Sequence, residues 1–218
     1  MSGNNLLLRE TIVVCSALIY WSGVLIHARR IRRNIGKPPN IKPRGLKENI
    51  LWLGWFVVIA SWIGQPFIIR NHGNAFLFSF INVLYHPHGI IFGALIALSG
   101  HAGTLWCYTV LGDNWRIGIN RKEKTALIAN GPYKFVRHPI YLFQIMILIG
   151  MIFFLPTPFS FMILLIHIAC VVMKALDEEA YLKNIHGHEY RTYLSQTGML
   201  LPRVYRLLDF FQRQGKSK

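Results

Sequence analysis

Five long apolar stretches constrain the fold of this chain more than any other feature. They are Thr11–His27, Ile50–Ile69, Tyr85–Leu111, Tyr141–Leu155 and Phe159–Ala175. About 20 apolar residues are enough for a helix to cross the hydrocarbon core of a bilayer. The composition agrees, because 53% of the residues are hydrophobic and only 15% are charged, unlike a typical soluble domain. We therefore predict an all-α, polytopic membrane helix bundle with about five transmembrane helices.

The last two stretches are predicted to form a tight antiparallel hairpin. Only Pro156-Thr157-Pro158 separates them, and proline favours a turn or the start of a helix. The polar segment GPYKFVRHPIY, Gly131–Tyr141, leads into the first arm, and Asp177-Glu178-Glu179 follows the second. The hairpin would return these carboxylates to the level of His138 and Tyr141. The sequence thus predicts a polar site at one edge of the membrane.

The basic residues predict the orientation of the bundle. Of the 24 Lys and Arg, all but Arg9 and Arg70 lie between the first and second stretches, between the third and fourth, or from Lys174 onward. Basic loops favour the cytoplasmic side, so we expect the N-terminus outside and the C-terminus in the cytoplasm. The same residues would attract anionic membrane lipids.

The net charge of +15 does not by itself indicate a nucleic-acid partner. The sequence shows no recognisable groove-fitting element or stacking surface, so we predict none. The first apolar stretch shows no signal-peptide cleavage site, and we expect it to remain as an anchor. A bacterial inner membrane and the endoplasmic reticulum suit these features equally.

We predict a single membrane domain over residues 1–218. Residues 1–110 would form a part with three spans, 111–205 would carry the polar motifs, and 206–218 would be a basic tail. Cysteines and histidines do not point to a metal. Cys15, Cys107 and Cys170 are widely separated, and such spacing suits neither a disulfide framework nor a thiolate site. Two histidine pairs, His86 with His88 and His186 with His188, fall on opposite sides of the predicted membrane, and their roles stay open.

Several short motifs occur in a distinctive order in the second half of the chain. They are LGDNWRIGI (Leu111–Ile119), TALIANGPY (Thr125–Tyr133), RHPIY (Arg137–Tyr141), EEAYL (Glu178–Leu182), a run with Gly187, Tyr190 and Tyr193, and Pro202-Arg203. This series resembles the integral-membrane methyltransferases that include isoprenylcysteine carboxyl methyltransferase and the phospholipid methyltransferases. The resemblance covers about Leu111 to Arg203, less than half of the chain.

The resemblance implies an enzyme that uses S-adenosylmethionine, with a C-terminal region that encloses this cofactor at the cytoplasmic face. The acceptor would be lipophilic or lipid-modified, with a carboxylate, amine or thiol head. The cofactor-binding residues implied by position are Thr125, Ala126, Leu127, Ile128, Tyr133, His138, Pro139, Ile140, Tyr141 and Glu178. Lys174 and Arg137 would bind the substrate. Methyl transfer mainly requires two reactants to be positioned, so no residue is assigned a catalytic role.

Helix geometry separates the roles of Glu178 and Glu179. Adjacent residues on a helix point about 100° apart, so only one carboxylate can face a ligand squarely. We predict that Glu178 faces the cofactor and that Glu179 meets a basic partner such as Arg137 or Lys183. We expect Tyr190 and Tyr193 to be aromatic residues of the membrane interface.

The chain also departs from the family pattern. A glycine usually stands where this sequence has Phe143, so we expect Phe143, Trp106 and Trp115 to wall a narrower acceptor tunnel. Replacing Phe143 with glycine would then change which chain lengths are accepted. Two other classes stay open, a membrane reductase of the sterol-reductase type that uses NADPH and a non-catalytic membrane scaffold. The identity of the acceptor and the oligomeric state are not determined by the sequence.

Overall fold

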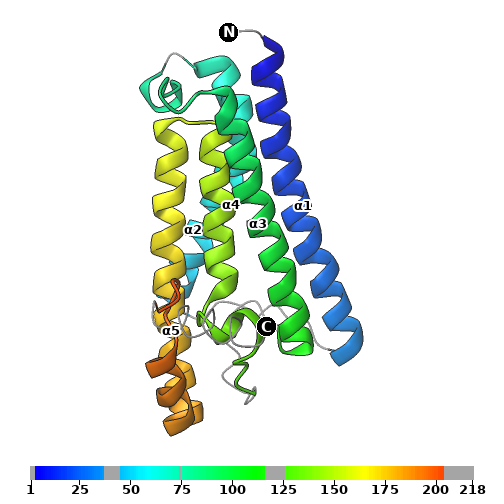
Figure 1. Cartoon of the computed structure of the whole chain (residues 1–218), viewed down its shortest axis with the longest axis vertical. Coiled ribbons are helices and arrows are strands. Elements are labelled where there is room, and N and C mark those ends of the chain that lie inside the picture. The colour runs from blue at the N-terminus through cyan, green and yellow to red at the C-terminus, as the bar shows by residue number, and fades with distance from the viewer. Residues whose placement is uncertain (1–2, 37–44, 74, 116–125, 204–218) are drawn as a thin grey trace, which may run out of the picture.

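A computed structural model describes residues 3–36, 45–73, 75–115 and 126–203 of the chain. Within them the protein is a bundle of five α-helices (Figure 1). These helices are α1 (Gly3–Ile35), α2 (Leu46–His72), α3 (Pro87–Leu111), α4 (Pro139–Phe154) and α5 (Pro158–Gln196). Three 3-10 turns accompany them, η1 (Phe76–Phe78), η2 (Gly112–Asn114) and η3 (Gly131–Lys134).

The lengths of the helices suit a membrane. Four of the described helices, α1, α2, α3 and α5, are long and apolar enough to cross a bilayer, and α4 is a shorter apolar helix of 16 residues. This confirms the prediction of a polytopic helical membrane bundle. α1 ends with Arg32 and Arg33, and α2 begins close to Lys47 at the same end of the bundle. We call this end the basic end.

Proline residues start three of the helices. Pro87, Pro139 and Pro158 stand at the first positions of α3, α4 and α5, where the missing N–H of proline costs no hydrogen bond. The Thr157 hydroxyl caps α5 by accepting a hydrogen bond from the Ser160 backbone N–H. α4 and α5 therefore form the tight hairpin that the sequence predicts, and Figure 1 shows the two helices side by side.

α5 is longer than predicted. The apolar stretch ends at Ala175, but the helix continues to Gln196 and kinks at Gly187, whose φ of 53° is left-handed. A helix satisfies its own backbone groups in water as in lipid, so the loss of apolar residues does not end it. Beyond α5 the chain returns to the motif segment, because the Arg137 N–H donates to Gly198 O at 2.9 Å and the His138 N–H to Met199 O at 3.1 Å.

Glycines bring α3 and α4 into very close contact. A Cβ on Gly93 would lie 2.8 Å from the Gly150 carbonyl oxygen, and a Cβ on Gly150 would lie 2.7 Å from the Gly93 oxygen. Small residues permit such approach between membrane helices. Closer to the basic end, the Phe143 ring of α4 packs over Gly103 of α3. A Cβ on Gly103 would collide with this ring. This contact fixes α4, the helix that begins at the polar motif.

Candidate active site

His138 and Tyr141 hold Glu178 at the basic end of the hairpin. His138 directly precedes α4 and is 7% exposed. Its Nδ1 lies 3.3 Å from Glu178 Oε2, and its Nε2 lies 3.4 Å from Glu179 Oε1 without aligned hydrogen-bond geometry. The Tyr141 hydroxyl donates a 2.8 Å hydrogen bond to Glu178 Oε1, and the His138 and Tyr141 rings stack at 5.7 Å. Residues from the two arms of the hairpin therefore meet as predicted.

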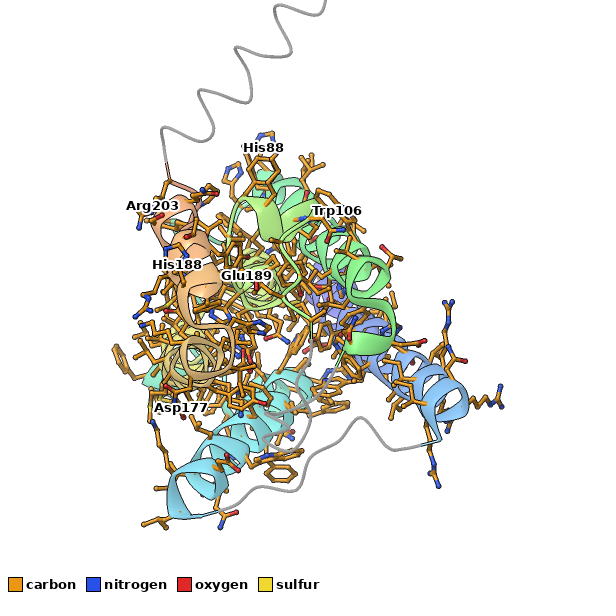
Figure 2. All side chains as sticks on the ribbon, turned by 90° about the horizontal axis from the view of Figure 1, so that it is seen from below. His88, Trp106, Asp177, His188, Glu189 and Arg203 are labelled. Carbon is orange, nitrogen blue, oxygen red and sulfur yellow. The ribbon has the colours of Figure 1, made fainter. Side chains whose placement is uncertain are left out.

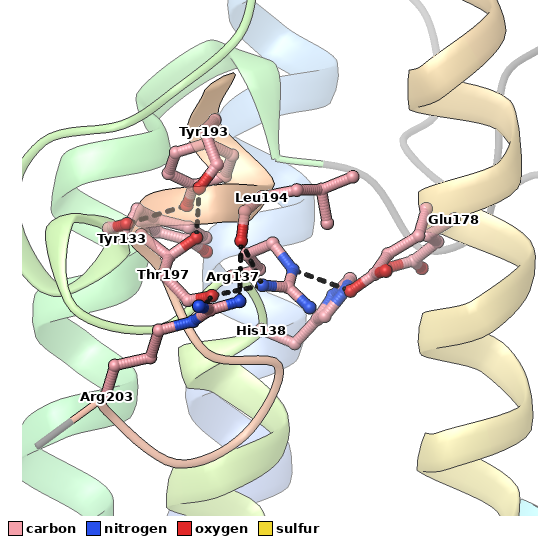
Figure 3. A network of polar contacts seen from close by, with 9 residues as sticks. Tyr133, Arg137, His138, Glu178, Tyr193, Leu194, Thr197 and Arg203 are labelled. Carbon is pink, nitrogen blue, oxygen red and sulfur yellow. Dashed lines mark hydrogen bonds and ion pairs between the residues drawn. The ribbon is translucent and has the colours of Figure 1, made fainter. Parts of the chain in front are cut away.

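Arg137 forms a buried ion pair with the other carboxylate. Its Nε lies 2.7 Å from Glu179 Oε1, and the two side chains are only 9% and 6% exposed. Its Nη1 also donates to the backbone carbonyls of Leu194 and Thr197, and Figure 3 shows Arg203 reaching Thr197 as well. The basic partner expected for Glu179 is thus Arg137, which ties α5 and the end of the chain to the motif segment.

The carboxylates change the proton affinity of His138. Burial alone would lower the pKa of this imidazole, but the contacts with Glu178 and Glu179 outweigh burial and raise the pKa above its ordinary value. Burial also raises the pKa of the Tyr133 phenol, so this group stays protonated. The Tyr193 hydroxyl donates a 2.6 Å hydrogen bond to the Tyr133 carbonyl. The site therefore combines two carboxylates, of which Glu179 is paired with Arg137, one imidazole with raised basicity and neutral phenols.

A cavity of about 520 Å³ opens beside these residues, a size typical of small-molecule sites. Nine of the residues predicted to bind cofactor or substrate line it: Ala126, Leu127, Ile128, Tyr133, Arg137, His138, Ile140, Tyr141 and Glu178. Pro139 is buried beside the cavity but is not among its lining residues, and neither is Lys174, which is buried on α5. Thr125 lies outside the described residues.

The cavity also extends away from the polar residues, between α1, α2 and α5, which the sequence did not predict. Leu25, Trp52 and Phe56 line it there and are 55%, 41% and 66% exposed. Because α1 and α2 are apolar membrane helices, this exposed wall faces lipid. Figure 2 shows α1 and α2 diverging at the basic end. One cavity therefore reaches both the charged cluster and the lipid-facing surface.

Two expectations about aromatic residues are wrong. Tyr190 is fully buried and Tyr193 is 8% exposed, and both line the cavity rather than the membrane interface. The kink at Gly187 turns the end of α5 back toward the motif segment, which places both rings inside. The run with Gly187, Tyr190 and Tyr193 was the sequence feature that could have indicated a role for these tyrosines at the site. The direction of the kink at Gly187 was not predictable from it.

The predicted tunnel wall is also wrong in part. Trp115 lines the cavity, but Phe143 and Trp106 do not. The Phe143 ring packs on Gly103 of α3, which has no side chain to keep it away. Trp106 is 49% exposed and lies at the periphery of the bundle (Figure 2). Phe143 therefore fills the α3–α4 contact and leaves the acceptor space unchanged.

Neither histidine pair belongs to a larger cluster of ligating side chains among the described residues. His86 and His88 stack on each other at 5.1 Å in exposed positions, and His186 lies 3.8 Å from Glu189. Among the described residues, no group of three or more His, Cys, Asp or Glu side chains is placed to hold a metal ion.

Fold and site together define an integral-membrane protein whose buried polar cluster shares one cavity with the lipid-facing surface. Residues 88–189 match the family model described as phospholipid methyltransferase. This match agrees with the resemblance of the motifs to the integral-membrane methyltransferases. It spans nearly all of α3, the whole of α4 and most of α5, with His138, Glu178 and Glu179. A search of curated proteins finds no match to the chain. The family implies methyltransferase activity on membrane substrates.

Proposed function

We propose that this protein transfers a methyl group from S-adenosylmethionine to a lipophilic acceptor that occupies the same cavity. The observation that carries this proposal is the single cavity that joins the Glu178 cluster to the lipid-facing wall at Leu25, Trp52 and Phe56. A water-soluble cofactor can reach one part of such a cavity, and a lipid can reach the other. The family match of residues 88–189 supports the same reaction and favours neither the reductase nor the scaffold.

The residues at the polar part fit S-adenosylmethionine. When bound, this cofactor supplies a methyl group activated by a sulfonium cation. The Glu178 carboxylate, fixed by Tyr141 and His138, would accept hydrogen bonds from the ribose hydroxyls or the ammonium group. The Tyr190 hydroxyl is buried and has no hydrogen-bond partner among the described residues, so it is available to donate to the cofactor carboxylate.

Apolar residues complete the proposed cofactor site. Ala126, Leu127, Ile128 and Leu182 line the cavity and would cover the adenine ring. We propose that Thr125 and Pro139 also belong to the cofactor site, because they adjoin Ala126 and Ile140 in the sequence. Charge is balanced close by, because Arg137 neutralises Glu179 and leaves Glu178 as the carboxylate that lines the cavity.

Arg137 and Lys174 differ in what they offer an acceptor. Arg137 contacts the Glu179 carboxylate and the backbone carbonyls of Leu194 and Thr197. Its first role would therefore be to position Glu179 and the end of α5. Lys174 lies one helical turn before Glu178 and is 8% exposed. We propose that its ammonium group favours an acceptor with an anionic head through charge rather than through direct lining of the cavity. The enzyme itself would orient the two reactants and exclude water.

We further propose that the basic end faces the cytoplasm, which places the N-terminus outside. The arginines at the end of α1 and Lys47 at the start of α2 support this orientation. S-adenosylmethionine would then be taken from the cytoplasm. A bacterial inner membrane and the endoplasmic reticulum both fit.

Calorimetric titration of the detergent-solubilised protein with S-adenosylhomocysteine tests the proposal. We expect saturable binding to the wild type, and binding at least about tenfold weaker in Glu178→Ala and His138→Ala, because each loses a charged contact. Glu189→Ala is the matched control, since this glutamate is 70% exposed beyond the kink. Absence of binding to a folded wild type would overturn the proposal, and binding of NADPH instead would favour the reductase.

A further inference from the structure

Three polar side chains from three helices line the cavity beyond the Glu178 cluster. Trp62 of α2, Gln144 of α4 and His167 of α5 all line it. We call these three residues the deep pocket. His167 precedes Glu178 by eleven residues on α5, which corresponds to about 16 Å along a helix. The deep pocket therefore lies within the membrane-spanning part of the bundle.

Polar atoms of the deep pocket lack partners. The Trp62 indole Nε1, the Gln144 Oε1 and both ring nitrogens of His167 are buried and make no hydrogen bond among the described residues. Trp62 and His167 are 6% and 7% exposed. Unpaired polar groups are costly away from water, and lipid offers no replacement partner.

Other buried polar groups in the same bundle are paired. Gln65 donates to the hydroxyls of Thr157 at 2.9 Å and Ser160 at 2.6 Å, and Ser16 bonds to His101 at 2.8 Å. These pairs lie away from the cavity lining, and they show that the protein can satisfy buried polar groups with its own side chains. In the deep pocket the unpaired atoms instead belong to side chains that line the cavity, although the Gln144 amide Nε2 donates to the Tyr20 hydroxyl. A small rotation of these side chains would let a ligand in the cavity supply the missing partners.

We infer that the deep pocket binds a hydroxyl or carbonyl oxygen of the acceptor, so that the acceptor is an oxygenated lipid rather than a plain hydrocarbon chain. An indole N–H can only donate, an amide oxygen only accepts, and a neutral imidazole does both. A hydroxyl group can therefore pair with Gln144 and with Trp62 or His167 at once. A hydrocarbon chain would leave all of these atoms unpaired.

The geometry also sets the spacing of the two polar parts of the acceptor. This step rests on the proposed function, because it assumes that the methylated atom lies near Glu178. His167 and Glu178 are separated by roughly 16 Å along α5, which is the upper end of the spacing. Gln144 lies closer to Glu178, because it is one helical turn from Tyr141, which contacts Glu178. Trp21 and Trp55 line the same cavity, and their buried indole N–H groups make no hydrogen bond within the described part of the chain. They would favour further oxygen atoms along the acceptor.

Two pairs of probes that differ by one terminal hydroxyl test this inference. They are dodecylamine with 12-aminododecan-1-ol and dodecanoic acid with 12-hydroxydodecanoic acid. Binding to the purified protein is measured by tryptophan fluorescence at a fixed detergent concentration, with and without S-adenosylhomocysteine. Within the pair whose head group the site accepts, we expect the hydroxylated probe to bind about 3–10-fold more tightly than its partner. This is the effect of one hydrogen bond.

Variants of Trp62 and His167 test whether the deep pocket causes the preference for the hydroxylated probes. Trp62→Phe keeps the ring but removes the N–H, and His167→Leu removes both nitrogens, so each should reduce the preference for the hydroxyl and the double variant should abolish it. Trp52→Phe is the control, because Trp52 is 41% exposed at the lipid-facing wall, and it should keep the preference. Equal affinity of both members of both pairs for the wild type would overturn the inference, as would a preference that survives in the double variant.

A separate titration with S-adenosylhomocysteine distinguishes the two proposals. If S-adenosylhomocysteine binds but the hydroxyl has no effect, the deep-pocket inference fails and the proposed function stands. If the hydroxyl preference is present but S-adenosylhomocysteine does not bind, the proposed function fails, and the deep pocket remains a site for an oxygenated lipid.

Discussion

The α3–α4 contact and the cavity between α1, α2 and α5 are built in opposite ways. On the first side, Gly93 and Gly150 allow two backbones to touch. On the second, large residues such as Trp52 and Trp62 line a space that they do not fill. The hydrophobic effect does not drive membrane helices together, so close packing must provide the attraction. The close contact fixes α4 and its polar start, and the loose side provides room for ligands.

The buried ion pair on the cavity side should give the largest effect on stability. We expect Arg137→Met to lower the free energy of unfolding by about 3–5 kcal/mol, because it leaves the buried Glu179 carboxylate without its partner. Unfolding in detergent by a chemical denaturant measures this loss. The double variant Arg137→Met with Glu179→Met should lose clearly less. Equal losses in the single and double variants would show that the charge of Glu179 is solvated in some other way.

A methyl group at the α3–α4 contact should be the next most damaging change. We expect Gly93→Ala to destabilise the protein by about 1–3 kcal/mol, since the new Cβ would meet the rigid Gly150 carbonyl. Gly64→Ala on α2 is the matched control, because no atom of the described residues lies within 4 Å of the position of its Cβ. Thermal unfolding of both variants compares the two sides directly. Similar melting temperatures for the two variants would contradict the proposed difference in packing between the two sides of the bundle.

Loss of one hydroxyl at the site should have a moderate effect on ligand affinity. Tyr141→Phe removes the 2.8 Å hydrogen bond to Glu178, and we expect it to weaken S-adenosylhomocysteine binding about 3–10-fold by releasing that carboxylate. Tyr85→Phe should leave the affinity unchanged, because the Tyr85 ring packs against Arg9 close to the start of α3. The start of α3 lies at the end of the bundle opposite the basic end (Figure 1). Calorimetric titration measures both. A similar change in the two variants would contradict a local role for Tyr141.

The pH dependence of stability should give the smallest effect. The pKa of His138 is raised above its model-peptide value of 6.5 in the folded protein, so the folded state binds the proton more tightly. Its contribution is therefore fully present below about pH 6.5 and is lost as the pH rises through the raised pKa. The stability difference between wild type and His138→Asn, measured by thermal unfolding from acid to mildly alkaline pH, should shrink in that direction. A stability difference that grows with pH would mean that the folded protein favours the neutral form of the His138 imidazole.

The sequence predicts those features that depend on local geometry. A hairpin with a three-residue turn brings His138 and Glu178 to the same level, and the 100° step of a helix separates Glu178 from Glu179. Features that depend on packing between distant helices were not predictable. The residues of α2 are apolar nearly all round, so their pattern does not reveal that Trp55 and Trp62 face a cavity.

The most direct test of the account is to map where the cofactor binds. The purified protein would be irradiated with ultraviolet light in the presence of methyl-labelled S-adenosylmethionine, and the labelled peptides identified. We expect labelling between Ala126 and Tyr141 or between Glu178 and Tyr193, and less labelling in Glu178→Ala. Labelling confined to other segments, or labelling that Glu178→Ala leaves unchanged, would contradict the proposed site.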